Sequence, residues 1–349
     1  MARQTQRTGN LKSPRARRGR VGRHDGRAVR KRRAPTLGPG DSAFALAYQS
    51  LGTDFQKLLA EEPNVRTQLD PEHVHQMRVA TRRMRASLRA FKKVLPVEAR
   101  KNVSSELKWL AQALGNVRDL DVQYENVQKY RTHVSGEDAA SLIDYQNHLV
   151  DAWQQARAEL FNQLAGDRYR ELVDSLKNFL RQGPPGVVRD GEDVLSIGAA
   201  ARQLMGKQRT TLLRRGRAIE PDSPDDDRHA LRIECKRLRY LLEFFRPVYG
   251  KPLNRYVKRL KKLQNVLGEL QDARVAVQQL REYAERVKAE FDDGAAQRSD
   301  ANVRRQLSVL NELIETEQNR AASRRAEFQK VWNRFPSKCK KNELLAVLT

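Results

Sequence analysis

The sequence predicts an all-α protein. Stretches rich in Leu, Ala, Arg, Gln and Glu recur at helical spacing over almost the whole chain after residue 40. Prolines gather between these stretches, and no stretch shows a convincing strand pattern. We therefore expect a protein built from packed helices alone.

Helix-start signals place the first two helices. Asp41 is expected to cap a helix that runs to about residue 61. The triplet Asp70-Pro71-Glu72 supplies a cap, a first-turn proline and a first-turn acid for a second helix, which is expected to end near residue 96.

Helical spacing continues up to a clear break. A third helix is expected to run through Leu110 and beyond Gly115, a fourth over about 138–166, and a shorter piece over 168–181. The stretch QGPPG at 182–186 then interrupts the pattern and has the composition of a linker.

The order of motifs repeats after this linker. The matches are Gly52 with Gly206 and His75 with His229, 154 residues apart, and LKWLAQALGNVRDLDV (107–122) with LKKLQNVLGELQDARV (260–275), 153 residues apart. A unit of roughly 150 residues with four main helices predicts a tandem-duplicated pair of four-helix bundles. We assign residues 1–36 to a basic tail, 37–186 to the first unit and 187–349 to the second.

The chain is strongly basic, with 67 Lys+Arg against 43 Asp+Glu and a net charge of +24, so a polyanionic partner is expected. Residues 1–36 hold 13 Lys/Arg and a single acid, which is half of the excess. Because this tail has almost no apolar residues to bury, we expect it to be disordered. It then serves either as an electrostatic arm or only as a solubilising tail.

Several classes of protein are not expected. Cys235 and Cys339 follow no metal or disulfide spacing, which suits a reducing compartment. No run of about 18 apolar residues occurs, and the N-terminus lacks the hydrophobic region of a secretory signal. We therefore expect a cytoplasmic protein with no membrane span.

Basic and apolar stripes are separated on the helix that contains His75. With about 100° of turn per residue, the basic stripe consists of His75, Arg78, Arg82, Arg85, Arg89 and Lys92. The apolar stripe, expected to face the core, consists of Met77, Met84, Leu88, Phe91 and Leu95.

The matching helix of the second unit has the same two stripes. Its basic stripe consists of His229, Arg232, Lys236, Arg239 and Arg246. Its core stripe consists of Leu231, Cys235, Leu238, Leu242, Phe245 and Tyr249. Glu243 stands where Arg89 stands in the first unit, so the two units are not equivalent.

A basic stripe of this kind can be a solvated face, but two observations favour a groove. Ile233, Tyr240 and Phe244 flank the charges on the side away from the core. The third helix of each unit also carries Lys, Gly and Asp on one face, namely Lys108, Gly115 and Asp119, and Lys261, Gly268 and Asp272. We expect the Gly to let a neighbouring backbone approach and the Asp to pair with an Arg of the stripe.

Arginine dominates the stripes, and its planar fork suits the repeated oxygens of phosphate chains. Few aromatic rings interleave with the charges, as they do in binders of single-stranded nucleic acid. Nucleic acid bound through residues 1–36 remains the alternative partner. No cluster of carboxylates that could hold Mg²⁺ lies near the stripes, so we expect no catalytic residues and no cofactor.

His75 and His229 are the histidines that correspond between the units. His73 lies about 200° round the helix from His75, and no Cys, Asp or Glu recurs beside both corresponding histidines, so no metal site is expected. No base accompanies them for a nucleophilic role. They are either structural residues near a helix start or proton-tuned donors, whose pKa rises beside phosphates.

At these residues the chain resembles the CHAD family of α-helical domains. The family signature has a histidine, an arginine three residues later and a basic cluster beginning at the eighth position. It fits His75, Arg78, Arg82, Arg83, Met84 and Arg85, and again His229, Arg232, Lys236, Arg237, Leu238, Arg239 and Tyr240. An LG-x-x-x-D element follows in each unit, at Leu114, Gly115 and Asp119 and at Leu267, Gly268 and Asp272. The resemblance covers about residues 38–335.

The resemblance implies two helical bundles related by a pseudo-twofold axis, with a basic central groove or pore that binds inorganic polyphosphate. It also implies association with polyphosphate granules in the cytoplasm. The expected binding residues are His75, Arg78, Arg82, Arg83, Arg85, Arg89, Lys92, Lys108, His229, Arg232, Lys236, Arg237, Arg239, Arg246, Lys258, Lys261 and Lys262.

Overall fold

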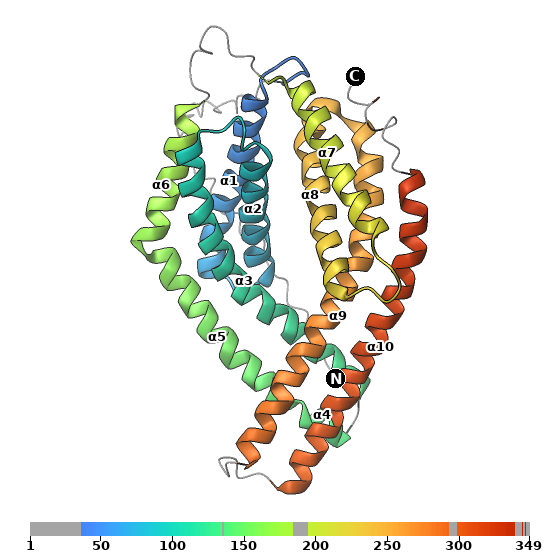
Figure 1. Ribbon diagram of the computed structural model, residues 1–349. Coiled ribbons are helices and arrows are strands. Elements are labelled where there is room, and N and C mark those ends of the chain that lie inside the picture. The colour runs from blue at the N-terminus through green and yellow to red at the C-terminus, as the bar shows by residue number, and fades with distance from the viewer. Residues whose placement is uncertain are drawn as a thin grey trace, which may run out of the picture. The chain divides into compact units, whose positions relative to one another are not determined.

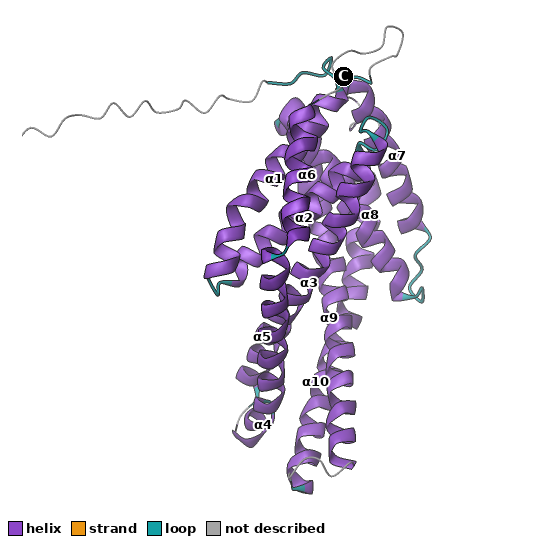
Figure 2. Ribbon diagram, turned by 90° about the vertical axis from the view of Figure 1, so that its left-hand side faces the viewer, coloured by secondary structure: helices purple, strands orange, loops and turns teal. Residues whose placement is uncertain are grey.

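The computed structural model describes residues 36–134, 136–183, 195–292 and 299–338, together with residues 344 and 346. Within these residues every regular element is a helix (Figures 1 and 2), which confirms the predicted fold class. None of the helices described there is long and apolar enough to cross a membrane. The predicted disordered tail lies outside the described residues, apart from Thr36.

The first part of the chain forms α1 to α6 and the second α7 to α10. The first set is α1 (Ala43–Thr67), α2 (Pro71–Ala90), α3 (Val97–His133), α4 (Gly136–Ser141), α5 (Ile143–Ala165) and α6 (Asp167–Gln182). The second set is α7 (Ile197–Arg217), α8 (Asp225–Tyr249), the 3₁₀ helix η1 (Lys251–Leu253), α9 (Asn254–Asp292) and α10 (Asp300–Lys338). The single helix expected over 138–166 is divided into α4 and α5.

Helix starts were predicted with one error. Asp70 caps α2 as expected, because its side chain accepts a hydrogen bond from the backbone N–H of Glu72 (2.8 Å). Ser42, not Asp41, caps α1, through a bond from the N–H of Phe44 (3.2 Å). The carboxylate of Asp41 accepts from the N–H of Gly38 instead (2.7 Å). It therefore closes the turn that precedes the helix.

The helix of the first basic stripe is shorter than expected. α2 ends at Ala90, and the chain turns over residues 91–95 before α3 begins. Lys92 therefore lies in the turn that follows α2.

The apolar stripes lie in the core, as predicted. Met77, Met84, Leu88, Phe91 and Leu95 are buried on α2 and the turn after it, and Leu231, Cys235, Leu238, Leu242 and Phe245 are buried on α8. Tyr249 is half-buried. These residues belong to one continuous cluster that includes side chains from α1 to α3 and from α7 to α10. The two halves therefore share a core.

A second core joins the far ends of the two halves. α9 and α10 form a long antiparallel hairpin that extends past the other helices of the second half (Figure 1). Val127 of α3 and Tyr145 of α5 belong to the same apolar cluster as Leu280 of α9 and Leu310 of α10. The rings of Tyr145 and Tyr283 stack there, with centroids 4.2 Å apart.

The contact between α2 and α8 brings the two basic helices together. Phe91 packs against Phe244 and Phe245, with ring centroids 6.1 and 5.9 Å apart. At the starts of α1 and α7, the N–H of Ala43 donates to the carbonyl of Leu195 (2.9 Å) and the N–H of Ile197 to that of Asp41 (2.7 Å). These bonds tie the first helices of the two halves to each other.

Candidate anion-binding site

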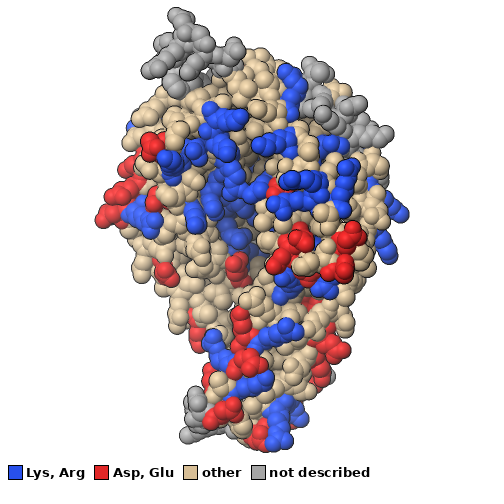
Figure 3. Space-filling model, in the orientation of Figure 1, with Lys and Arg blue, Asp and Glu red and all other residues tan. Residues whose placement is uncertain are grey.

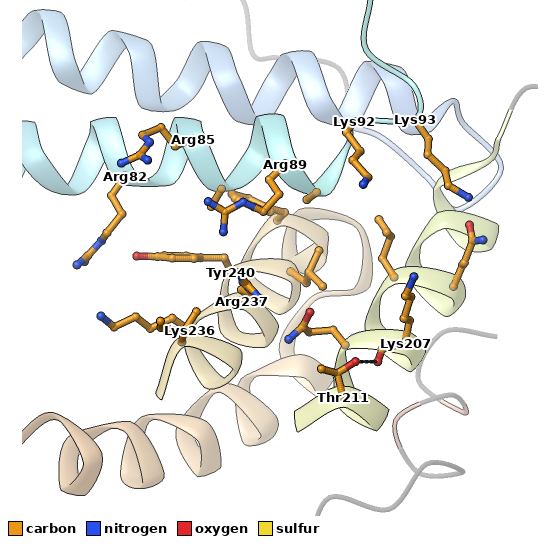
Figure 4. A pocket seen from close by; sticks show the side chains of 18 residues that line it. Arg82, Arg85, Arg89, Lys92, Lys93, Lys207, Thr211, Lys236, Arg237 and Tyr240 are labelled. Carbon is orange, nitrogen blue, oxygen red and sulfur yellow. Dashed lines mark hydrogen bonds between the residues drawn. The ribbon is translucent and has the colours of Figure 1, made fainter. Parts of the chain in front are cut away.

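A cavity of about 390 Å³ opens between α2, α7 and α8 (Figure 4). The basic side chains that line it are Arg82, Arg85, Arg89, Lys92 and Lys93 from α2 and the turn after it, Lys207 from α7, and Lys236 and Arg237 from α8. In the space-filling view, Lys and Arg gather in and around a hollow in the upper part of the molecule, the part that contains α2, α7 and α8 (Figure 3). The part beyond it, around the α9–α10 hairpin, carries both signs of charge.

Lys236 lies where the basic stripes of α2 and α8 meet. Arg78 and Arg82 of α2, and Arg232 and Arg239 of α8, all act on it electrostatically. Burial, followed by these four positive charges, lowers the pKa of Lys236 to about 7. A lysine ammonium is therefore disfavoured here unless negative charge enters the site.

Many of the cations form no ion pair within the described residues. A group held by an internal carboxylate has less need of an external anion, so the unpaired cations are the ones available to a ligand. No ion pair within the described residues involves Arg82, Arg85, Arg89, Lys92, Lys93, Lys207, Arg232 or Lys236. Two of them, Arg82 and Arg232, are among the charges that lower the pKa of Lys236.

Other arginines of the stripes are already paired. Arg83 donates from Nε to both carboxylate oxygens of Asp54 (3.0 and 3.1 Å) and also pairs with Glu243. Arg239 pairs with the other oxygen of Glu243 (3.1 Å). Arg237 pairs with Glu234 (2.9 Å). Internal acids therefore neutralise part of the stripe and leave the rest cationic.

The Gly and Asp of the third helix lie beside the stripe arginines. A Cβ on Gly115 would lie 3.8 Å from Nε of Arg78, and a Cβ on Gly268 would lie the same distance from Nε of Arg232. The expectation that a neighbouring backbone approaches these glycines is wrong. Instead, the guanidinium group of an arginine from α2 or α8 lies against each glycine, at a distance that still leaves room for a Cβ.

The predicted pairing of the third-helix Asp with a stripe arginine is confirmed for the first half. Asp119 Oδ1 lies 3.7 Å from Nη2 of Arg78. In the second half Asp272 acts on Arg232 electrostatically and opposes the lowering of its pKa by burial. Asp119 pairs with its arginine without enclosing it, since the Asp119 side chain is 65% exposed.

The two corresponding histidines have different surroundings. Burial lowers the pKa of His75, and the charges of Arg118, Arg82 and Arg78 lower it further, against the opposing charge of Glu72. His229 donates from Nδ1 to Oε1 of Gln271 (2.7 Å).

Neither histidine caps its helix. Asp70 caps α2, and Pro224 precedes α8. In the part of the chain that the structure describes, no group of three or more His, Cys, Asp or Glu side chains is arranged to hold a metal ion.

Some predicted binding residues lie away from the cavity. Lys108, Lys258 and Lys261 are exposed on α3 and α9 and do not line it, and Arg246 is exposed near the end of α8. Lys262 lines a separate hollow between α9 and α10, together with Arg259 and Arg334. Lys108 and Lys261 do lie two turns before Gly115 and Gly268, on the same helix faces. A role in binding stays a prediction for all five of these predicted residues.

Lys93 and Lys207 line the cavity but were not among the predicted site residues. Lys93 follows Lys92 in the turn after α2, a turn that helical spacing alone did not predict. Lys207 comes from α7, a stretch whose sequence suggested only a counterpart of the first helix. The basic residues of this helix, among them Arg202, Lys207 and Arg209, were the available signal.

The sequence matches the CHAD domain family over residues 49–281, which is more than half of the chain. The chain therefore belongs to the CHAD family. The crystal structure of the CHAD domain from the plant Ricinus communis is similar, with a TM-score of 0.68 and 26% sequence identity, covering 87% of this chain and 96% of that one. PptA from Streptomyces chartreusis shares the fold, with a TM-score of 0.64, 17% identity and coverage of 84% and 100%.

Two curated proteins from Mycobacterium tuberculosis are also similar. They are the uncharacterized proteins MT2285, from strain CDC 1551 / Oshkosh, and Rv2226, from strain ATCC 25618 / H37Rv. Each is 26% identical over 211 residues, which is 59% of this chain and 39% of that protein. The chain thus spans about two fifths of the length of these relatives.

Proposed function

We propose that this protein binds inorganic polyphosphate without catalysing a reaction. In this proposal two tandem-duplicated halves, related by a pseudo-twofold axis, each contribute a basic helix to a common groove. One observation carries the proposal: Arg78, Arg82 and Arg232 surround Lys236 from two helices. Within the described residues none of Lys236, Arg82 and Arg232 forms an ion pair, although Asp272 acts electrostatically on Arg232 and Lys236.

A linear phosphate chain fits this arrangement chemically. It presents the same singly charged unit many times, and each guanidinium can donate two parallel bonds to the oxygens of one unit. Bringing cations together in a half-buried site costs free energy that a polyanion recovers on binding. The CHAD family, to which the chain belongs, is associated with polyphosphate binding.

The acids near the stripes support a non-catalytic role. Asp54, Glu234 and Glu243 each form ion pairs with arginines of the protein. Metal-assisted phosphoryl transfer needs carboxylates that are free to hold Mg²⁺ beside the phosphate. These three carboxylates are already engaged by arginines of the protein.

Affinity measured in rising salt tests the proposal. Wild type, Arg78→Ala and Arg232→Ala are titrated with polyphosphate, with Arg304→Ala as the matched control. Arg304 is a 78% exposed arginine on α10 that pairs with Asp300. Each site variant is expected to lose about 1.5–3 kcal/mol of binding free energy and to show a shallower salt dependence. Equal affinities for all four proteins would show that the groove does not bind polyphosphate.

Nucleic acid is a second candidate partner, favoured by the charge of residues 1–36, which hold 13 Lys/Arg. Long-chain polyphosphate is made to compete with RNA and with DNA of equal charge, using the full chain and a chain without residues 1–36. Polyphosphate is expected to win in both proteins. A preference for nucleic acid that disappears with the tail would favour the second candidate.

A polyphosphate binder of this kind is proposed to work in the cytoplasm, on polyphosphate granules. A fluorescent fusion of the protein is expected to coincide with granules in cells that accumulate them. The same fusion carrying Arg78→Ala and Arg232→Ala should be diffuse. Granule association that persists in the double variant would show that the groove does not direct it.

A further inference from the structure

The cavity between α2, α7 and α8 has an apolar floor beneath its cationic rim. Ala86 and Ala90 of α2 and Leu204 of α7 line it from one side. Ile233, Tyr240, Leu241 and Phe244 of α8 line it from the other. Ile233 and Leu204 are half-buried, so part of their surface is open to an occupant.

Inorganic polyphosphate does not account for this floor. A phosphate chain is charged along its whole length and gains nothing from aliphatic or aromatic surface. An occupant that uses both parts of the cavity must carry an apolar body next to its negative charge. The volume, about 390 Å³, lies in the range of small-molecule sites.

The cavity lies at one edge of the α2–α8 contact, and the two edges differ in charge. At one edge Arg83 of α2 pairs with Glu243 of α8. The positions 154 residues away are Arg237 and Arg89, which both line the cavity at the other edge. Burial, followed by the charge of Arg237, lowers the pKa of Arg89. An ion pair between α2 and α8 thus closes the first edge, while at the second edge Arg89 and Arg237 both line the cavity and Arg237 pairs with Glu234 of its own helix.

A buried hydroxyl marks where a phosphate can bind. Tyr240 is only 6% exposed, yet its hydroxyl has no hydrogen-bond partner among the described residues. In Figure 4 this hydroxyl points toward the end of the cavity where Arg82 and Lys236 lie. A buried polar group without a partner is costly, and a phosphate oxygen placed there would accept its hydrogen bond.

We propose that this cavity binds an organic phosphate, a molecule that joins one or more phosphate groups to a compact apolar body. The phosphate lies at the end formed by Tyr240, Arg82 and Lys236, with Arg89 and Arg237 at the side. The apolar body lies against Ile233 and Leu204. The site shares Arg82 and Lys236 with the polyphosphate groove, but its selectivity comes from the apolar floor, which the groove does not need.

Calorimetric titration with matched pairs of ligands tests this proposal. Adenosine triphosphate is compared with inorganic tripolyphosphate, and geranyl diphosphate with inorganic pyrophosphate. Each pair has the same number of phosphates, and the first partner adds a planar or an aliphatic body. At least one organic ligand is expected to bind tenfold or more tightly than its inorganic counterpart. The pair of ligands that shows this difference identifies whether the cavity prefers a planar or an aliphatic body.

Cavity-filling variants then locate the effect. Leu204→Trp fills the cavity from α7. Thr211, which also lines the cavity from α7, provides a second variant, Thr211→Trp, so that one variant remains if the other folds poorly. Ser50→Trp is the matched control, because Ser50 stands 154 residues before Leu204, on α1. Both filled variants should lose the organic preference and keep the wild-type affinity for long-chain polyphosphate, while the control keeps both.

Two outcomes would overturn the proposal. One is that neither organic phosphate binds more tightly than its inorganic counterpart. The other is that the preference survives unchanged in both filled variants. Neither outcome affects the polyphosphate proposal, which depends on Arg78 and Arg232 and is tested with ligands that have no apolar part.

Discussion

Arg83 of α2 forms an ion pair with Glu243 of α8, with Nη1 and Oε2 2.5 Å apart. The same arginine also holds Asp54 of α1, and Glu243 also accepts from Arg239. One acid therefore anchors two arginines at the contact between the two halves. Glu243 stands 154 residues after Arg89, so the acid at this position, unlike that arginine, joins α2 to α8.

Glu243→Gln is expected to destabilise the free protein. Glu243 is 14% exposed, and its loss leaves the charges of Arg83 and Arg239 less compensated at a half-buried contact. The free energy of unfolding should fall by about 1.5–3 kcal/mol, as measured by urea denaturation. Polyphosphate should bind this variant more tightly, because both arginines lose a competing anion.

An exposed ion pair provides the control. Glu98 pairs with Lys101, and their side chains are 79% and 61% exposed. Glu98→Gln should change stability by less than about 0.5 kcal/mol. If Glu243→Gln costs no more than this, the pair does not hold the halves together.

Gly115 and Gly268 are expected to matter for binding through the arginines beside them. An Ala Cβ fits at 3.8 Å from Arg78 or Arg232, so Gly115→Ala and Gly268→Ala should keep the affinity for polyphosphate and stabilise the helix by up to about 1 kcal/mol. A leucine side chain reaches further and should displace the guanidinium. Gly115→Leu should therefore weaken binding as much as Arg78→Ala does. Equal affinities for the Ala and Leu variants would contradict this role.

Polyphosphate affinity is expected to depend on pH through Lys236. Its pKa is about 7 in the free protein because of burial and the charges of Arg78, Arg82, Arg232 and Arg239, and Asp272 is the acid that acts on it. Bound polyanion favours the ammonium form, so binding above pH 7 takes up a proton. Affinity should fall by up to about tenfold per pH unit above 7 and be flat with respect to this group below it.

Lys236→Arg isolates this effect. The guanidinium keeps its charge throughout the range, so the variant should lose the fall in affinity above pH 7 that wild type shows. The pKa of His75 is lowered from 6.5, so that group titrates below this range. Identical profiles for wild type and Lys236→Arg would show that Lys236 does not change its charge on binding.

Gly216 is expected to be required for packing α7 against α10. A Cβ at this position would lie 2.1 Å from a ring carbon of Trp332, a side chain that is only 6% exposed. Gly216→Ala should cost about 1–3 kcal/mol of stability through overpacking. At Gly206, on the same helix, an added Cβ meets nothing within 4 Å. Gly206→Ala should therefore be neutral or stabilising, and equal thermal shifts for the two variants would contradict the packing role.

Local signals in the sequence were sufficient for the helices and for the buried face of α2 and α8. The triplet at 70–72 fixed the start of α2, and helical spacing identified Met84 and Leu238 as core residues, both of which are buried. These features depend on neighbours within a few turns. The position of a helix cap could be predicted only to within one residue. Asp41 and Ser42 are both residue types that cap helices well, and the backbone conformation determines which of them does so.

Features that depend on contacts between the halves could not be read from helical spacing. The shared core, the pairing of Arg83 with Glu243 and the contribution of Lys207 all require the relative placement of α2, α7 and α8. Spacing along one helix shows which side chains share a face. It does not show which of these side chains pair with an acid on another helix. That pairing determines which arginines remain available to a ligand.

The stoichiometry of binding separates one shared groove from two independent basic surfaces. Polyphosphate of a single defined length, long enough to span both halves, is titrated calorimetrically into wild type, Arg78→Ala, Arg232→Ala and the double variant. We predict one chain bound per protein molecule in wild type and in both single variants, with affinity lowered in each single variant and lowest in the double. Two chains bound per molecule, with each single variant removing one of them, would contradict a common groove.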